Sequence, residues 1–270
     1  MIDEMTVEKA TKISRNDQTK RPRKKVWFFL CLALIGGFSY LVYLAVDWCE
    51  YTNFFNLDKI EVSGVSILSN EEIIKIAGLK NHVSLLKLDI HQIQNQLEME
   101  PYIEAAVVSR EFPNHLKIMI KERIPVCYLN TGTLWLIDQQ GIILPLRKEK
   151  LKANLPVITG FEKDSARCRP GQLAPNPEMF KALNFIQTAA LKANTLYTEI
   201  SEIFAWKKGE FIIYTVNGGT PIYIGRGDLI KQLYILAAFQ NLIKSKRTFA
   251  DYQYLDLRWD KQIIARERKS

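Results

Sequence analysis

The chain has 270 residues, of which 47% are hydrophobic and 24% are charged, and these ordinary globular values exclude disorder throughout. Its 13 glycines and 10 prolines are too few for a collagen-like or low-complexity protein. The formal net charge of +8 would suit a nucleic acid or an anionic membrane, so the position of the charges decides what it means.

Residues 1–25 form a basic tail that carries half of this net charge. Five of its cations stand directly before an apolar run, and they are Lys20, Arg21, Arg23, Lys24 and Lys25. A basic cluster beside an apolar segment marks the cytoplasmic end of a membrane span. We therefore interpret these residues as a membrane-topology signal rather than as a nucleic-acid site.

Residues 26–46 are predicted to form a transmembrane helix. This run contains no Asp, Glu, Lys or Arg, and at about 1.5 Å per residue it spans about 31 Å, close to the thickness of a bilayer core. Asp47 and Glu50 follow it, so the N-terminus is expected in the cytoplasm and residues 47–270 across the membrane. A cleaved signal peptide is less consistent, because the run is long and no A-x-A-like site follows.

The sequence offers no recognisable catalytic or metal-binding motif. It has no G-x-S-x-G, no phosphate-binding loop, no G-x-G-x-x-G, and no C-x-x-C or H-E-x-x-H spacing. We therefore expect no enzyme, no cofactor and no metal. Cys49, Cys127 and Cys168 lie beyond the membrane span, where a disulfide is permitted, and the sequence leaves their pairing open.

After a connector at 47–56, residues 57–126 predict a small domain with the order β-α-α-β-β. A short strand at 60–62 precedes a helix that begins at a capping box made by Ser69 and Glu72. Asp89 caps a second helix, which Pro101 ends. Strands at 103–111 and 116–121 follow, so that one amphipathic sheet is covered by two helices.

Residues 127–266 predict a strand-rich domain with two helices, followed by a short tail at 267–270. A hairpin is expected around 138–141, an edge segment at 155–160 because Pro156 cannot donate to a sheet, and a meander of strands at 199–206, 211–216 and 221–224. The helices are expected at 176–193 and 228–244, and the last strands at 252–259 and 262–265. Asp256 is expected to form a cross-strand ion pair. The fold class is therefore α+β.

This order of elements resembles the bacterial cell-division family FtsQ/DivIB. The resemblance covers about residues 20–266, and its most specific stretches are FNLDKIEVSGVSILSNEEIIKIAGL, YIEAAVVSREFPNHLKIMIKERIPV, LIDQQG, LPVITG, IYIGRGDL and YQYLDLRWD. It implies that 57–126 is a POTRA domain and that 127–266 is the β domain of the family. Glu122-Arg123-Ile124-Pro125 matches the E-R-x-P strand end of the family, which we expect to set the domain junction.

The resemblance further implies binding of the coiled-coil partner FtsB at the last strand. The expected contact residues are Tyr254, Asp256, Arg258, Trp259, Lys261, Gln262, Ile263 and Ile264. An edge strand can be extended by a partner strand, and Trp dominates many interface hot spots. The alternative for Trp259 is that its side chain merely packs on the sheet.

The resulting hypothesis is a non-enzymatic division scaffold that binds FtsB-like and FtsL-like proteins and links early and late septation proteins. It would be a single-pass type II protein of the inner membrane, located at the division septum. One alternative is a POTRA-containing accessory of polypeptide translocation or envelope assembly. Another is a wall-modifying enzyme anchored by its N-terminus.

Overall fold

The computed structural model describes residues 22–79, 83–147, 154–259 and 262–268. The chain divides into two compact units. The first draws its described residues from 1–59, 81–88 and 110–115, and the second from 60–80, 89–109 and 116–270.

The first unit contains the long helix α2, Pro22–Tyr51. Residues 26–49 of this helix are apolar enough to cross a membrane, and none of them is buried. The helix therefore includes the predicted span at 26–46 and continues past it. In the same unit, Arg110 donates hydrogen bonds to the carbonyl groups of Leu85 and Leu88 at 2.9 and 2.5 Å, which fixes the segment before α4 (Ile90–Glu98) to a strand residue.

The predicted β-α-α-β-β order is confirmed. Its elements are β1 (Lys59–Ser63), α3 (Asn70–Ile76), α4 (Ile90–Glu98), β2 (Ile103–Glu111) and β3 (His115–Glu122), and the sheet order is β1-β3-β2. The capping box of Ser69 and Glu72 and the cap of Asp89 both form as expected. The sheet and the two helices bury one apolar layer, which includes Ile73, Leu97, Leu116 and Ile118.

The second sheet has nine strands in the order β12-β11-β10-β9-β8-β7-β4-β5-β6. Their bounds are β4 Pro125–Asn130, β5 Leu134–Asp138, β6 Ile143–Leu144, β7 Val157–Thr159, β8 Ile200–Lys207, β9 Glu210–Thr215, β10 Pro221–Ile224, β11 Tyr252–Asp256 and β12 Ile264–Glu267. The β5–β6 hairpin and the antiparallel meander β8-β9-β10 agree with the sequence prediction.

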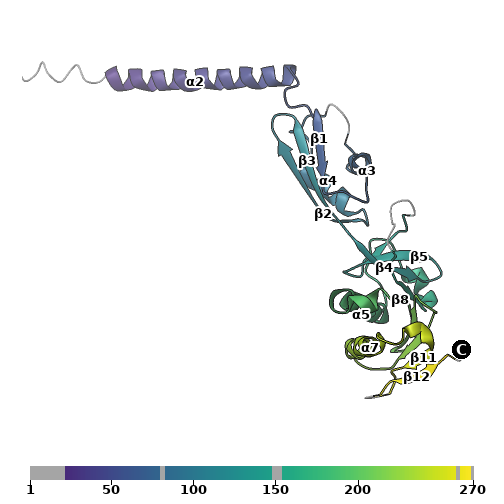
Figure 1. The fold of residues 1–270 in the computed structure, drawn as a ribbon. Coiled ribbons are helices and arrows are strands. Elements are labelled where there is room, and N and C mark those ends of the chain that lie inside the picture. Colours follow the sequence, from purple (N-terminus) through teal and green to yellow (C-terminus); the bar gives the residue numbers. More distant parts are fainter. Residues whose placement is uncertain (1–21, 80–82, 148–153, 260–261, 269–270) are drawn as a thin grey trace, which may run out of the picture. The chain divides into compact units, whose positions relative to one another are not determined.

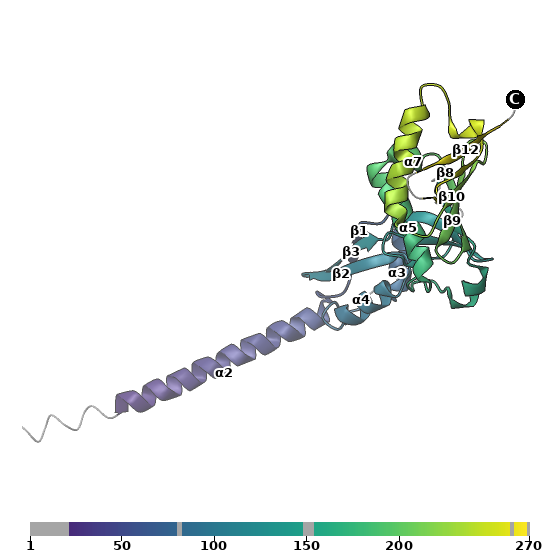
Figure 2. The ribbon, with the colours of Figure 1, turned by 90° about the horizontal axis from the view of Figure 1, so that it is seen from below.

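Helices α5 (Pro177–Lys192) and α7 (Leu229–Ile243) lie side by side on one face of this sheet (Figures 1 and 2). Their buried side chains, such as Phe185 and Leu233, form one core with strand residues such as Ile213 and Leu255. The two helices are those expected from the sequence. A third, four-residue helix, α6 (Asn194–Tyr197), and the short 3-10 helices Glu162–Arg167 and Phe249–Asp251 were not expected.

The predicted edge segment at 155–160 is wrong. Strand β7 lies inside the sheet and pairs in parallel with β4 on one side and β8 on the other. Pro156 lies just before the strand, where its carbonyl accepts the Tyr128 N–H at 2.9 Å. Because proline keeps a full acceptor, it is tolerated at the start of an internal strand, where its missing N–H is not needed.

The E-R-x-P segment begins with a buried carboxylate. Glu122 accepts hydrogen bonds from the backbone of Ser66, Ile67 and Leu68 at 2.7 to 2.8 Å, and also from the Ser66 hydroxyl. Burial by itself would raise the pKa of Glu122, but these hydrogen bonds outweigh it and hold the pKa below its usual value. Arg123 then donates to Asp138 at 2.8 Å and to Gln140 at 2.9 Å. Both residues therefore make contacts within the fold.

Candidate partner-binding edge

Strand β12 is the last strand of the nine-stranded sheet and pairs only with β11 among the described residues. All four of its residues are exposed. The outer side of an edge strand presents a row of N–H and C=O groups, and these are open to another chain. This edge therefore has the geometry that strand addition requires. The strand begins two residues later than predicted and β11 ends three residues earlier.

The edge strand is fixed in place by contacts at its far end. Arg247, which follows α7, forms an ion pair with Glu267. Arg268 donates to the carbonyl groups of Tyr252 at 3.1 Å and Gly218 at 2.6 Å. Because the strand is already ordered, a partner that adds to it loses less conformational entropy on binding.

Asp256 and Arg258 form a clamp at the end of β11. Arg258 donates Nε and Nη2 to the two carboxylate oxygens at 2.9 and 2.6 Å, and its backbone N–H adds a bond at 3.0 Å. The hydrogen bonds from the Arg258 side chain hold the pKa of Asp256 below its usual value, although burial opposes them. The predicted cross-strand pair is wrong, because the partner lies two residues along the same segment and Ile264 lies opposite Asp256.

A row of aromatic rings crosses the face of the sheet opposite the helices. Trp206 of β8, Tyr223 of β10 and Tyr254 of β11 follow one another with ring centroids 6.2 Å apart. The Arg258 guanidinium lies 5.2 Å from the centre of the Tyr223 ring and 6.0 Å from that of Trp206, and Lys207 lies 4.1 Å from the centre of the Trp206 ring. These cation–π contacts present two positive charges on an apolar surface. Sequence reasoning found Tyr254 and Arg258 but missed the other members.

Gly225 allows the segment that carries Arg258 to pack closely against the end of β10. A Cβ atom at position 225 would lie 2.9 Å from the Cα atom of Arg258, closer than real side chains allow. The missing side chain lets the segment after β11 pass directly beside the end of β10, where the Leu257 N–H donates to the Tyr223 carbonyl at 2.9 Å. The sequence analysis treated the Gly225-Arg226-Gly227 turn as local geometry only, and this packing role was not predicted.

Trp259 is exposed over 59% of its surface. It lines a groove of about 610 Å³ together with Ile263, Gln262 and residues at the start of α7. More than half of the Trp259 surface is therefore open to solvent and accessible to a partner. An exposed tryptophan beside an apolar side chain is typical of an interface anchor.

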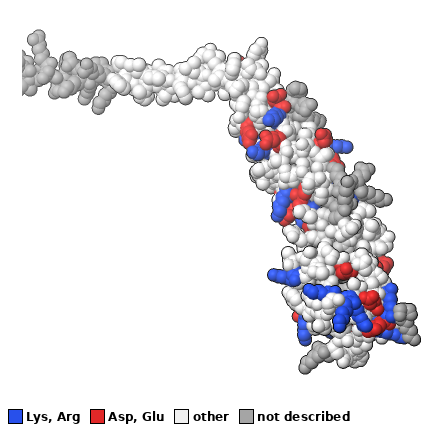
Figure 3. All heavy atoms as spheres, in the orientation of Figure 1, with Lys and Arg blue, Asp and Glu red and all other residues white. Residues whose placement is uncertain are grey.

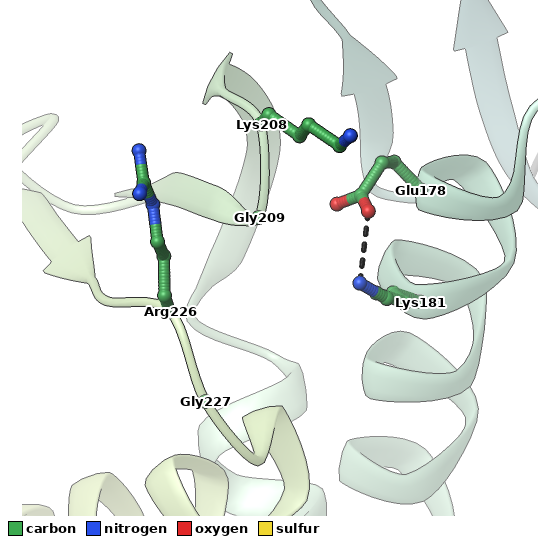
Figure 4. A pocket seen from close by; sticks show the side chains of 6 residues that line it. All are labelled: Glu178, Lys181, Lys208, Gly209, Arg226 and Gly227. Atoms are coloured by element: carbon green, nitrogen blue, oxygen red, sulfur yellow. Dashed lines mark hydrogen bonds and ion pairs between the residues drawn. The ribbon is translucent and has the colours of Figure 1, made fainter.

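A second hollow, of about 360 Å³, shares Arg226 and Gly227 with the groove. Figure 4 shows Lys208 directed towards Glu178, which forms an ion pair with Lys181 at 2.8 Å. Arg226 pairs with Glu210 at 3.0 Å. Figure 3 shows Lys and Arg side chains gathered over the part of the molecule that holds α7, β11 and β12, with Asp and Glu among them. This surface is therefore rich in cations that are already partly paired.

The remaining predicted residues are the basic cluster before the membrane span, Lys261 and the cysteines. Lys20, Arg21 and Lys261 lie outside the described residues, whereas Arg23, Lys24 and Lys25 belong to the first turn of α2. All four cysteines are free thiols, and burial raises the pKa of Cys168. The described residues hold no group of three or more His, Cys, Asp or Glu that could bind a metal ion.

Comparison with known proteins adds an independent observation. Residues 55–123 match the family described as POTRA domain, FtsQ-type, and residues 124–266 match the family described as FtsQ/DivIB, C-terminal related. The chain belongs to the FtsQ/DivIB family. It is 30% identical over 242 residues to the cell division protein FtsQ of Geobacter sp. (strain M21), a match that covers 87% of this chain and 84% of that protein.

Two further relatives agree with this assignment. The FtsQ protein of Geotalea daltonii is 28% identical over 92% of this chain and 88% of its own length. The cell division protein DivIB of Clostridium botulinum is 25% identical over 87% of this chain and 91% of its own length. As a member of the FtsQ/DivIB family, the chain has a role in cell division, and α2 fits a single-pass membrane protein.

Proposed function

We propose that this chain is a non-enzymatic scaffold of the division machinery that binds FtsB-like and FtsL-like proteins and links early and late septation proteins. The observation that carries the proposal is the open, pre-ordered edge of β12 beside exposed Trp259. An edge of this kind binds a polypeptide through its backbone, which needs no catalytic group.

In the proposed complex, a strand of the FtsB-like protein adds to the outer side of β12. Main-chain hydrogen bonds along Ile264–Glu267 supply affinity, and Trp259 and Ile263 accept an apolar side chain in the groove. Arg258, held by Asp256, and Lys207 on the Trp206 ring offer positive charge to acidic side chains of the partner. Backbone, apolar and charged groups at this edge thus take different roles in the proposed complex.

The same proposal includes a topology and a domain plan. The basic cluster of residues 20–25 keeps the N-terminus in the cytoplasm, and the acidic residues Asp47 and Glu50 lie across the membrane. The POTRA domain then spans 57–126 and the β domain 127–266, with both outside the cytoplasm at the division septum. Glu122 and Arg123 act within the fold in this plan rather than as partner contacts.

The scaffold role is tested in cells and the binding edge in vitro. Depletion of the protein should give filamentous cells, and a labelled copy should gather at mid-cell; a uniform membrane distribution with normal division would reject the role.

The binding edge is tested with the full chain in lipid nanodiscs. Replacing both residues, Trp259→Glu and Ile263→Glu, should abolish pull-down of the FtsB-like protein. The control is Met99→Glu, an equally simple change at an exposed apolar residue of the POTRA part. Undiminished pull-down by the Trp259 and Ile263 variant would reject the edge.

A further inference from the structure

The turn that follows α2 brings an aromatic ring back against the end of this helix. Asn53 ends the helix with a φ of 52°, a left-handed conformation that asparagine tolerates at this position. The Phe54 N–H then donates to the Cys49 carbonyl at 3.1 Å, and the centroid of the Phe54 ring lies 6.3 Å from that of Trp48. Trp48 belongs to the last turn of residues 26–49, the part of α2 that is apolar enough to cross a membrane. Phe54 therefore lies beside the end of the membrane span.

Ring contacts continue from Phe54 to the turn between β2 and β3. The centroids of the Phe54 and Phe55 rings lie 5.2 Å apart, and Phe55 meets Phe112 edge to face at 6.1 Å. Phe112 stands directly after β2, so it lies at the tip of the hairpin that β2 forms with β3. Edge-to-face aromatic pairs add stability beyond the area that they bury. A chain of ring contacts thus joins the hairpin tip to Trp48.

Hydrogen bonds fix a third segment beside these rings. The Leu85 N–H donates to the Phe55 carbonyl at 2.7 Å, and Arg110 binds the carbonyl groups of Leu85 and Leu88. Leu86, between these two leucines, has an exposed side chain. All of these residues belong to the first compact unit, together with α2. The unit therefore holds exposed apolar side chains from three segments in fixed positions.

The aromatic rings at this end of the unit are open to solvent. Phe112 is 62% exposed, and Trp48 and Phe54 are exposed as well. An exposed apolar patch usually has a partner, and aromatic rings are enriched where a membrane meets water. The membrane span itself adjoins this patch, because Trp48 belongs to both. The bilayer surface is therefore the partner that the geometry favours.

Charge gives no comparable reason for a membrane contact. The segments 47–59, 83–88 and 110–115 carry charges of both signs, with Lys59, Lys87 and Arg110 against Asp47, Glu50, Asp58 and Glu111. They have no excess of positive charge that would attract an anionic lipid. Insertion of aromatic rings depends instead on the apolar area that enters the bilayer surface.

We propose that the rings of Phe54 and Phe112 insert into the bilayer surface where α2 leaves it, and so seat the β2–β3 turn of the POTRA domain on the membrane. The inference goes beyond the proposed function, since it concerns a lipid surface rather than a division partner, and it requires only that α2 crosses the membrane. The bilayer then holds the chain at a second place besides the helix. This contact limits how far the residues after α2 can turn about the end of the helix.

The test uses the full chain in nanodiscs whose lipids carry bromine, which quenches tryptophan fluorescence, either near the headgroup or near the end of the acyl chains. Phe112→Trp keeps an aromatic ring at the hairpin tip and adds one emitter to those of the parent chain. Shallow bromine should quench about half or more of the added emission, and deep bromine should quench less, because interfacial rings lie at the headgroup level. Leu191→Trp is the matched control at an exposed apolar residue of α5, and its added emission should not be quenched.

A second variant removes the neighbouring ring. Phe54→Glu in the Phe112→Trp chain should lower the quenching of the added emission by about twofold or more, because less apolar area enters the bilayer surface. Thermal unfolding of each variant shows whether the fold is kept. Replacing neutral lipids by anionic ones should leave the quenching unchanged.

Four results would overturn the inference. The first is the absence of lipid quenching at position 112. The second is equal quenching at position 191, which would show unspecific contact between the chain and the disc. Quenching that requires anionic lipids would assign the contact to charge rather than to the rings. Added emission that is shielded from a water-soluble quencher, yet not quenched by bromine in the lipid, would show that a second copy of the chain covers Phe112.

Discussion

The two edge strands of the nine-stranded sheet, β6 and β12, differ in whether their outer side is covered by another segment of the chain. At one end, Ile143 and Leu144 of β6 are fully buried, and the next segment closes the edge. The Ile143 N–H donates to the Gln172 carbonyl at 2.9 Å, and its carbonyl accepts the Gly171 N–H at 2.8 Å. At the other end, every residue of β12 is exposed, and no described backbone group bonds to its outer side.

This difference indicates that the fold is able to cover a sheet edge and that the edge at β12 is left open selectively. An exposed edge invites unwanted pairing between chains, and proteins usually cover it. Here the chain covers β6 with its own backbone and fixes β12 through Arg247 and Arg268 without covering it. The β6 edge should therefore matter for stability and the β12 edge for binding.

The largest loss of stability is expected at the covered edge. Ile143→Asp places a carboxylate in the core, because Ile143 is 0% exposed. We expect the free energy of unfolding to fall by about 4 kcal/mol, from lost apolar burial and an unpaired polar group. Urea unfolding of the chain measures this, and a loss below about 1 kcal/mol would contradict the contrast between the two edges.

In the POTRA part, a side chain rather than another backbone segment satisfies main-chain donors: the Glu122 carboxylate accepts hydrogen bonds from the N–H groups of residues 66–68. Glu122→Gln should lower the free energy of unfolding by about 2 to 3 kcal/mol, since it disrupts charge-assisted hydrogen bonds to residues 66–68. The folded pKa is depressed, so this stabilisation is fully present above the unfolded pKa of about 4.3 and is lost as pH falls through the folded value.

Unfolding measured as a function of pH checks both statements. The difference between the parent chain and Glu122→Gln should be constant at neutral pH and shrink in acid. Glu71→Gln, at an exposed residue of α3, serves as the control. A difference that grows as pH falls would contradict the assigned direction of the pKa.

The clamp beside the open edge should have a smaller effect. Asp256→Asn removes the charge that Arg258 binds, and we expect a loss of about 1 kcal/mol, because Arg258 itself is partly exposed. Binding of the FtsB-like protein should also weaken, since the guanidinium is no longer fixed over Tyr223. Calorimetric titration and urea unfolding measure the two effects, with Asp58→Asn as an exposed control. Unchanged stability and binding would show that Asp256 does not fix the Arg258 guanidinium in a way that matters for either property.

The smallest loss of stability is expected on the open edge itself. Ile264→Asp on β12 should cost less than about 1 kcal/mol, because the side chain is exposed. The same change should weaken binding of the FtsB-like protein by about tenfold, since it puts a negative charge where an acidic partner is expected. A pull-down with parallel thermal unfolding separates the effects, and strong destabilisation without loss of binding would reverse the comparison.

Local features of this fold were predictable from the sequence because short-range chemistry determines them. The caps at Ser69 and Asp89 use hydrogen bonds to residues three positions along the chain. The hairpin after β5 needs positive φ at Gly141, and the residue has a φ of 87°. The terminal edge strand was also predictable, because apolar residues and turns alternate up to the last strand.

The features that were missed depend on which strands become neighbours. Strand β7 is internal because β4 and β8, distant in sequence, close on both of its sides. The aromatic row joins β8, β10 and β11, and its members share no local pattern. The partners of Glu122 lie more than fifty positions earlier, so the sequence alone did not indicate where its charge is satisfied.

The parallel pairing of β10 with β11 also affects when the chain becomes able to bind. Ile222 lies beside Leu255, and the chain between them must first form α7 and cross back over the sheet. Closing so long a connection costs chain entropy before its contacts form, which slows folding. Strand β12 can pair only once β11 is in place. The outer side of β12 therefore exists as an ordered edge only when this long connection has closed, so the proposed binding surface depends on the packing of α7 as well as on the strand itself.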